Sequence, residues 1–146
     1  MNKTLIAASL AFIAGSAFAQ MSPVGVWKTI DDKTNTERAQ VRVTDNGGVL
    51  TGRIEKLLAG STMTPDAKCD KCDDDRKDKP VVGLDIVRGV KKGDGDLWEG
   101  GTILDAGEGK VYKVRMTPIE GGKKMEVRGY VGMPMLGRTQ VWIRTE

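Results

Sequence analysis

The two cysteines of the chain stand close together in a charged segment, where they could do redox, metal or structural chemistry. Cys69 and Cys72 have the spacing Cys-x-x-Cys. A thioredoxin-type pair needs its first cysteine at a helix start, and a zinc site needs further cysteine or histidine ligands, which this sequence does not contain. Both readings stay open, but in an oxidising compartment we expect a disulfide. By restricting the unfolded chain, such a disulfide would stabilise the fold by about 2 kcal/mol.

Histidine is absent from the chain, and its absence excludes whole classes of reaction. Neither a Ser-His-Asp nor a Cys-His apparatus can be assembled without it, and the His-ligated sites of zinc, copper and non-haem iron are excluded too. An enzyme would depend on lysine, tyrosine or paired carboxylates, with Asp85, Glu99 and Glu126 as the acids to test. No catalytic motif is recognisable. We therefore assign no catalytic residue, cofactor or metal ligand, and lean towards a protein that is not an enzyme.

A pattern of short β-strands and glycine-rich turns must position these residues. Residues 45–48, 92–96, 106–109 and 120–122 contain glycines that supply the positive φ of tight hairpins. The predicted strands are residues 24–30, 38–44, 49–57, 81–88, 97–104, 111–119, 124–131 and 138–145. Sequential hairpins imply up-and-down order, and closure removes exposed strand edges. The predicted fold is all-β: a single eight-stranded up-and-down antiparallel barrel.

Side chains along the predicted strands alternate between an apolar and a polar face. In the second strand, Ala39, Val41 and Val43 oppose Gln40 and Arg42. A membrane-spanning barrel would need a continuous apolar outer band, which the charged residues on these strands do not allow. No mature segment is long and apolar enough for a membrane helix. An eight-stranded barrel is just wide enough to fill with its own side chains or to hold one small ligand.

Aromatic and basic side chains on the predicted strands are candidates for the wall of a ligand site. Small-molecule sites are lined by apolar and aromatic side chains with a few polar groups. The candidates for ligand contacts are Trp27, Trp98, Tyr130, Trp142, Arg128 and Arg138. The same rings also suit a packed core, so both roles stay open for each of them.

Two segments interrupt the strand pattern. Residues 58–80 are too long and polar for a hairpin and contain both cysteines, so they form either a binding segment or a solvated connection. Between the last two strands, Met133 and Met135 could bind cuprous copper. Methionine more often fills irregular apolar space. Because Leu136 follows, we expect both methionines to pack at the end of the barrel.

The first residues have the order of parts of a cleavable secretory signal. Lys3 precedes an apolar run at residues 5–14 and the small-residue end Ala17-Phe18-Ala19. We expect residues 1–19 to be a signal peptide, residues 20–146 to form one domain, and the compartment to be the periplasm. The 23 basic and 20 acidic residues are interleaved rather than gathered in blocks, so no nucleic-acid surface is expected.

Several blocks of residues together resemble a family of exported bacterial proteins. They are residues 25–32, the Cys-x-x-Cys segment with residues 77–84, and residues 98–101, 128–132 and 136–142. The family is catalogued as a domain of unknown function, and the resemblance implies a lipocalin-like barrel over essentially the whole mature chain without supplying an activity. The Gly25-x-Trp27 start also resembles the first strand of lipocalins. That resemblance implies that Trp27 plugs a closed barrel end and that a late arginine, Arg138 or Arg144, covers it.

Two functional hypotheses follow from the size of the barrel and the placement of its rings. The first is a periplasmic binding module for a lipophilic or amphipathic small molecule, with Arg128 or Arg138 meeting a polar head. The second is a filled barrel that binds an envelope protein through residues 58–80.

Overall fold

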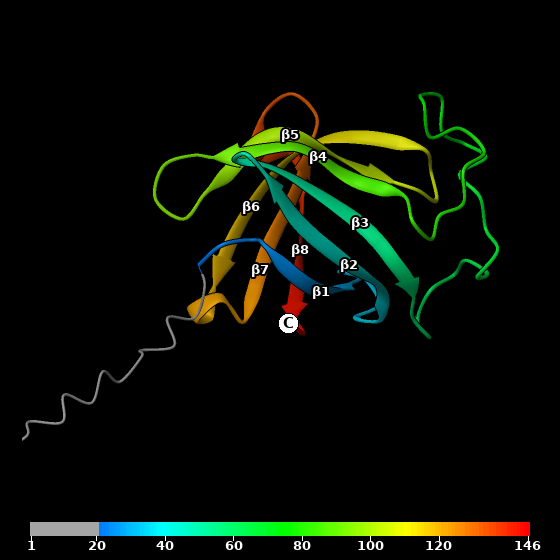
Figure 1. Ribbon diagram of the computed structural model, residues 1–146, viewed down its shortest axis with the longest axis horizontal. Helices are drawn as coiled ribbons and strands as arrows, with labels where there is room; N and C mark the ends of the chain where they lie inside the picture. The colour runs from blue at the N-terminus through cyan, green and yellow to red at the C-terminus, as the bar shows by residue number, and fades with distance from the viewer. Residues whose placement is uncertain (1–20) are drawn as a thin grey trace, which may run out of the picture.

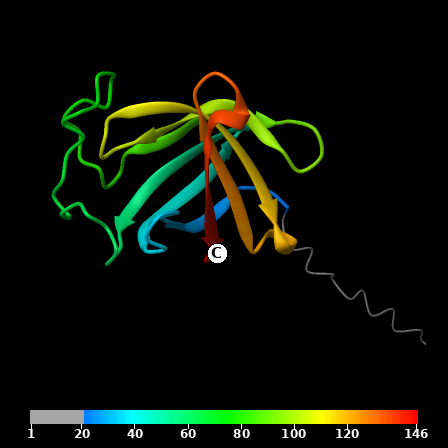
Figure 2. The same cartoon turned by 180° about the vertical axis from the view of Figure 1, so that it is seen from behind.

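The strands of the protein follow the predicted order and close on themselves. The computed structural model describes residues 21–146, so the predicted signal peptide at residues 1–19 lies outside the described residues. Eight strands pair antiparallel in sequence order, and the last returns to the first (Figure 1, and from behind in Figure 2). They are β1 Gly25–Ile30, β2 Glu37–Asn46, β3 Val49–Leu57, β4 Asp85–Lys92, β5 Trp98–Asp105, β6 Lys110–Ile119, β7 Lys124–Tyr130 and β8 Arg138–Arg144. The predicted eight-stranded up-and-down barrel is confirmed.

The alternation of side chains along each strand builds the barrel core. In β2, Ala39, Val41 and Val43 are buried, whereas Arg42 is exposed, as a period of two requires. Where β4 and β5 approach closely, a Cβ atom on Gly101 would lie only 2.1 Å from the carbonyl oxygen of Arg88, so only glycine fits. The largest fully buried side chains are Trp27, Trp142, Leu50, Met116 and Met125.

The fourth strand differs most from its predicted bounds. The sequence predicts a strand at residues 81–88, but β4 runs from Asp85 to Lys92. Val81 is buried in a turn instead, where its N–H donates to the carbonyl of Ala67 at 2.9 Å. Gly83 has φ of +93° and ends the extended backbone there. The connection between β3 and β4 therefore continues past residue 80 to Leu84.

The two ends of the barrel differ. The start of β1, the end of β8 and the β2–β3, β4–β5 and β6–β7 turns lie at one end, and the β1–β2, β3–β4, β5–β6 and β7–β8 connections lie at the other. In Figure 1 the long β3–β4 connection, in green, stands at the right of the barrel beside the yellow β5–β6 turn. The β7–β8 connection, in orange-red, stands at the top.

Trp27 and Arg144 seal the end of the barrel at which β1 begins and β8 ends. Trp27 is fully buried, and its indole N–H donates to the carbonyl of Pro23 at 2.8 Å. The guanidinium carbon of Arg144 lies 4.2 Å from the ring centroid, which is a cation–π contact. Burial lowers the pKa of Arg144, and its guanidinium donates at 2.6 Å to each of the carbonyls of Ser22, Val24 and Gly122. Of the two arginines left open by the sequence, Arg144 is the one that covers Trp27.

Candidate functional site

A cavity of about 600 Å³ lies inside the barrel and opens at the end opposite Trp27. Its lining includes residues from all four connections at that end, among them Lys33, Met63, Gly107 and Leu136. The volume is within the roughly 300–1,000 Å³ of small-molecule sites. An eight-stranded barrel can be filled by its own side chains or hold one small ligand, and this barrel has an open interior.

The strand β8 shows how the cavity changes with depth. Alternate residues of β8 face inwards, with Arg138 at the mouth, then Gln140, then Trp142, and finally Arg144 at the closed end. Apolar side chains form much of the remaining wall, among them Ala39, Ile54, Ile103 and Val127. The mouth therefore carries the charged Arg138, and both polar and apolar side chains line the wall.

Two arginine–aspartate pairs stand at the mouth. Arg38 donates to Asp31 at 3.0 Å, and Arg138 binds both carboxylate oxygens of Asp32. The backbone N–H of Thr34 is the main cause that lowers the pKa of Asp31 to about 2, and the bond to Asp32 raises the pKa of Arg138. Each arginine at the mouth therefore has a carboxylate partner.

Three of the six candidate residues lie on the cavity wall, namely Tyr130, Trp142 and Arg138. The remaining three lie elsewhere. Trp27 belongs to the closed end, and Trp98 is half-buried at the start of β5 with the Lys92 ammonium 5.9 Å from its ring centroid. Arg128 faces away from the cavity. Ligand contact by the three residues on the wall stays a prediction.

Sequence reasoning missed Arg38 as a mouth residue. Its Nε atom is buried and has no hydrogen-bond partner among residues 21–146. The alternation of β2, in which Ala39 faces inwards, suggests that Arg38 faces outwards, so the simple period of two hides its place at the rim. Its ion pair with Asp31 in the β1–β2 connection draws the guanidinium over the mouth.

The carboxylates considered for catalysis do not converge on the cavity. Asp85 pairs with Arg53 at 2.9 Å, Glu99 pairs with Arg115 at 3.1 Å, and Glu126 is exposed on β7. None of the three acids lines the cavity. Within the described part of the chain, no three histidine, cysteine, aspartate or glutamate side chains are grouped to hold a metal ion.

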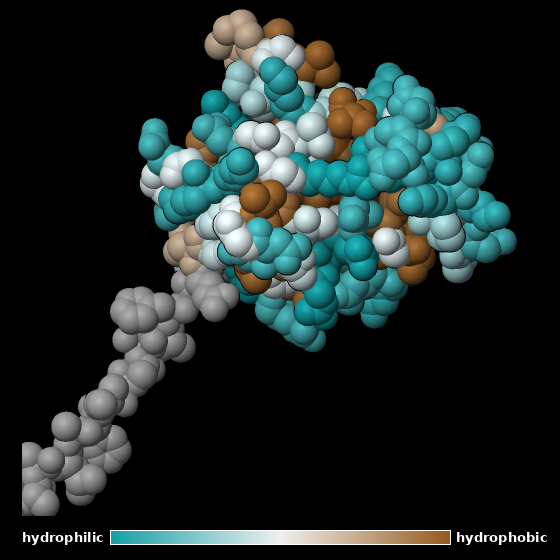
Figure 3. All heavy atoms as spheres, turned by 45° about the horizontal axis from the view of Figure 1, so that its top comes forward, coloured by the Kyte–Doolittle hydropathy of each residue, from teal (hydrophilic) through white to brown (hydrophobic). Residues whose placement is uncertain are grey.

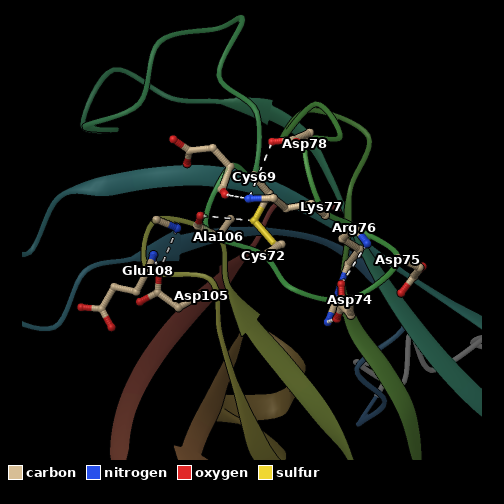
Figure 4. The surroundings of a disulfide bond; sticks show 12 residues. Cys69, Cys72, Asp74, Asp75, Arg76, Lys77, Asp78, Asp105, Ala106 and Glu108 are labelled. Atoms are coloured by element: carbon tan, nitrogen blue, oxygen red, sulfur yellow. Dashed lines mark hydrogen bonds and ion pairs between the residues drawn. A yellow bond between two sulfur atoms is a disulfide. The ribbon is translucent and has the colours of Figure 1, made fainter.

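The Cys69–Cys72 disulfide is present, as the sequence predicts, and both cysteines are buried. Figure 4 shows it packed against the β5–β6 turn, where the Cys69 sulfur lies 3.6 Å from the carbonyl oxygen of Ala106. The backbone approach there is so close that a Cβ on Gly109 would lie 2.0 Å from the carbonyl oxygen of Lys71. The disulfide segment is thus anchored to the rim of the cavity.

A buried arginine anchors the same connection to β4. Arg76 is 3% exposed, donates to the backbone carbonyl of Asp85 at 2.9 Å and pairs with Asp74 at 2.5 Å. The hydrogen bond from Arg76 lowers the pKa of Asp74 to about 2. The sequence predicts either a binding segment or a solvated connection for residues 58–80. The connection is polar on its outside but is also fixed to the barrel, so neither alternative describes it fully.

The expectation that Met133 and Met135 pack at the barrel end is wrong. Their exposed fractions are 56% and 72%. Arg128 holds this connection from outside, since its Nε–H donates to the carbonyl of Pro134 at 2.5 Å and its Nη1 donates to Thr139 Oγ1 at 2.7 Å. The methionines are turned outwards, away from the cavity.

The closed eight-stranded barrel, plugged at one end and hollow at the other, is a lipocalin-like fold. The chain belongs to the family DUF2147, described as an uncharacterized protein conserved in bacteria, which matches residues 25–144. Among solved structures it is similar to HP1028 from Helicobacter pylori, described as belonging to the lipocalin family, with a TM-score of 0.69 and 19% identity over 84% of this chain and 82% of that chain. At that identity the likeness shows the fold alone. A search of curated proteins gave no match.

Lipocalin-like barrels are suited in general to holding a small molecule inside. Among the residues that the structure describes, no helix is both long and apolar enough to cross a bilayer.

Proposed function

We propose that the protein is a periplasmic binding protein for a lipophilic or amphipathic small molecule. The observation that carries this proposal is the open cavity of about 600 Å³. An elongated ligand with a polar head suits this cavity, because the head can lie by the arginines of the mouth while the rest contacts the apolar side chains of the wall. The signal-like residues 1–19 and the disulfide support export to an oxidising compartment.

The mouth favours a head that accepts hydrogen bonds without carrying a strong charge. Asp31 and Asp32 already neutralise the two arginines at the rim. The buried Nε–H of Arg38 still offers a hydrogen bond that no group within residues 21–146 accepts. A hydroxyl, ester or amide oxygen of the ligand would satisfy that donor, which otherwise costs about 1–3 kcal/mol.

The second hypothesis from the sequence, a filled barrel that binds an envelope protein, has less support. Its first premise does not hold, because the interior contains a cavity. Residues 58–80 are also fixed against the barrel through Cys69, Cys72 and Arg76, and no described feature favours a protein partner there.

A titration with the apolar fluorophore N-phenyl-1-naphthylamine, with monoolein as competitor because its head has hydroxyl and ester oxygens, tests the proposal. Gly129 faces the cavity, and a Cβ there would lie 3.5 Å from Tyr112 Cβ and 3.6 Å from Ile103 Cγ2, which are ordinary contacts. A Gly129→Leu side chain therefore fits at its base and extends into the cavity. Glu126→Leu puts the same side chain on the outer face of β7 and is the matched control.

We expect Gly129→Leu to weaken probe binding at least about tenfold and Glu126→Leu to leave it unchanged. Equal affinity in the wild type and Gly129→Leu would refute binding in the cavity. Native mass spectrometry of protein purified from the periplasm adds a direct readout, because a bound small molecule would give a discrete mass adduct. Recovery in the cytoplasmic fraction with the leader intact would refute the proposed compartment.

A further inference from the structure

Large apolar side chains project from the connection between β7 and β8, which we call the apolar tip (residues 131–136). Their exposed fractions are 67% for Val131, 56% for Met133, 72% for Met135 and 72% for Leu136. The projection at the top of Figure 3 is accordingly brown and tan, whereas the region of the long β3–β4 connection at the right is mostly teal. Contiguous exposed apolar groups of this kind mark interaction sites.

The backbone of the apolar tip holds these side chains outwards. The segment Pro134–Leu136 forms one turn of 3₁₀ helix, in which the Leu136 N–H donates to the carbonyl of Met133 at 3.0 Å. Arg128 donates to the carbonyl of Pro134 from the outer face of β7. Gly137 closes the base, since a Cβ there would lie 2.4 Å from the carbonyl oxygen of Gly129. The exposure therefore follows from fixed geometry.

The apolar tip is continuous with the cavity. Val131 and Leu136 are exposed and also line the cavity mouth. Met133 and Met135 lie beyond them and are not part of the lining. An apolar path thus leads from the outermost methionines over the rim and into the interior.

We infer that the apolar tip inserts into a lipid bilayer surface and brings the cavity mouth against it. The exposed apolar surface of the tip is on the order of a few hundred Å², which is less than the roughly 800 Å² per partner that a stable protein interface buries. A few inserted apolar side chains with nearby basic groups, by contrast, suffice for reversible attachment to a bilayer. The tip itself contains no charged residue. At the base of the tip, the exposed Lys113 of β6 is in register with Tyr130 of β7. When the tip is inserted, an anionic lipid headgroup would lie next to Lys113.

This inference goes beyond the proposed function, and it can be tested separately from ligand binding. The test is flotation of the mature protein with vesicles of phosphatidylethanolamine and phosphatidylglycerol, compared with phosphatidylcholine vesicles. Met133→Ser with Met135→Ser removes exposed apolar groups of the tip and spares the cavity lining. Val141→Ser with Ile143→Ser is the matched control, because both residues are 38% exposed on the outer face of β8.

We expect the tip variant to bind anionic vesicles at least about tenfold more weakly than the wild type, with N-phenyl-1-naphthylamine binding unchanged. The β8 variant should bind vesicles like the wild type. Lys113→Glu should weaken binding to anionic vesicles and leave the weaker binding to phosphatidylcholine unchanged. A wild type that binds the probe but floats with neither vesicle would overturn the inference and leave the proposed function standing. A dimer that the tip mutations dissociate, without vesicle binding, would also overturn it, because a second copy would then cover the tip.

Discussion

Replacing Arg144 with alanine is expected to remove a large share of the stability of the barrel. The side chain makes a cation–π contact with Trp27 and donates to three backbone carbonyls at 2.6 Å. Hydrogen bonds from charged groups contribute about 1.5–3 kcal/mol each and a desolvated cation–π contact about 2 kcal/mol. Because these contacts act on one side chain and are not additive, we expect a loss of about 3–5 kcal/mol, out of the roughly 5–15 kcal/mol typical of a domain.

Urea unfolding followed by tryptophan fluorescence measures this loss. Arg144→Lys should fall between the wild type and Arg144→Ala, because lysine keeps the charge but loses the planar fork. The control is Arg53→Ala, whose side chain is 61% exposed in its pair with Asp85 and should cost less than about 1 kcal/mol. If Arg144→Ala unfolds within about 1 kcal/mol of the wild type, the role assigned to the sealed end is wrong.

Two further predictions concern the disulfide and the acid stability of the fold. Replacing Cys69 and Cys72 with alanine should lower the unfolding free energy by about 2 kcal/mol, because the unfolded chain is no longer restricted. It should also make residues 58–80 sensitive to protease. If the variant resists protease as well as the wild type does, Arg76 alone fixes this connection. Asp31 and Asp74 have folded pKa values of about 2, below the unfolded value near 4. The two carboxylates therefore stabilise the folded state fully above pH 4, and this contribution is lost as the pH falls towards 2. Asp31→Asn should reduce this acid loss by about 1 kcal/mol after solvent screening, measured as the urea midpoint from pH 5 to 2.

Much of the fold could be predicted because strand patterning and hairpin glycines are local signals. The predicted bounds of the third strand coincide with β3, and the alternation of β2 gave the inward face directly. The alternation of β7 also contains the information that Arg128 faces outwards, since Met125 and Val127 face inwards. Arg128 is a ligand candidate only by residue type and by its nearness in sequence to the aromatic residues, and the alternation places it outside.

Other features depend on irregular backbone that the alternation cannot show. Trp98 stands at a register shift between Trp98 and Gly101, so counting in twos does not give its direction. The fourth strand was displaced because Val81 and Val82 resemble a strand while Gly83 turns the chain. Hydrophobicity predicted burial for Met133 and Met135, but their exposure follows from the bond between Arg128 and the carbonyl of Pro134, which joins groups on two different elements.

The short β1–β8 seam has a consequence for the order in which the chain folds. Seven of the strand pairs join neighbours in sequence, and only the seam, with two residue pairs in register, joins the two ends of the domain. Hairpins can therefore assemble one after another, while closure of the ring must wait for the last strand. The contact of Arg144 with Val24 spans 120 positions, a loop whose length-dependent closure cost is about 4 kcal/mol. The side chain that seals this end of the barrel thus also offsets the entropy of ring closure. In a circular permutant that links Glu146 to Ser22 and opens the chain at another turn, β1 and β8 would be neighbours in sequence, and their pairing would no longer wait for the last strand.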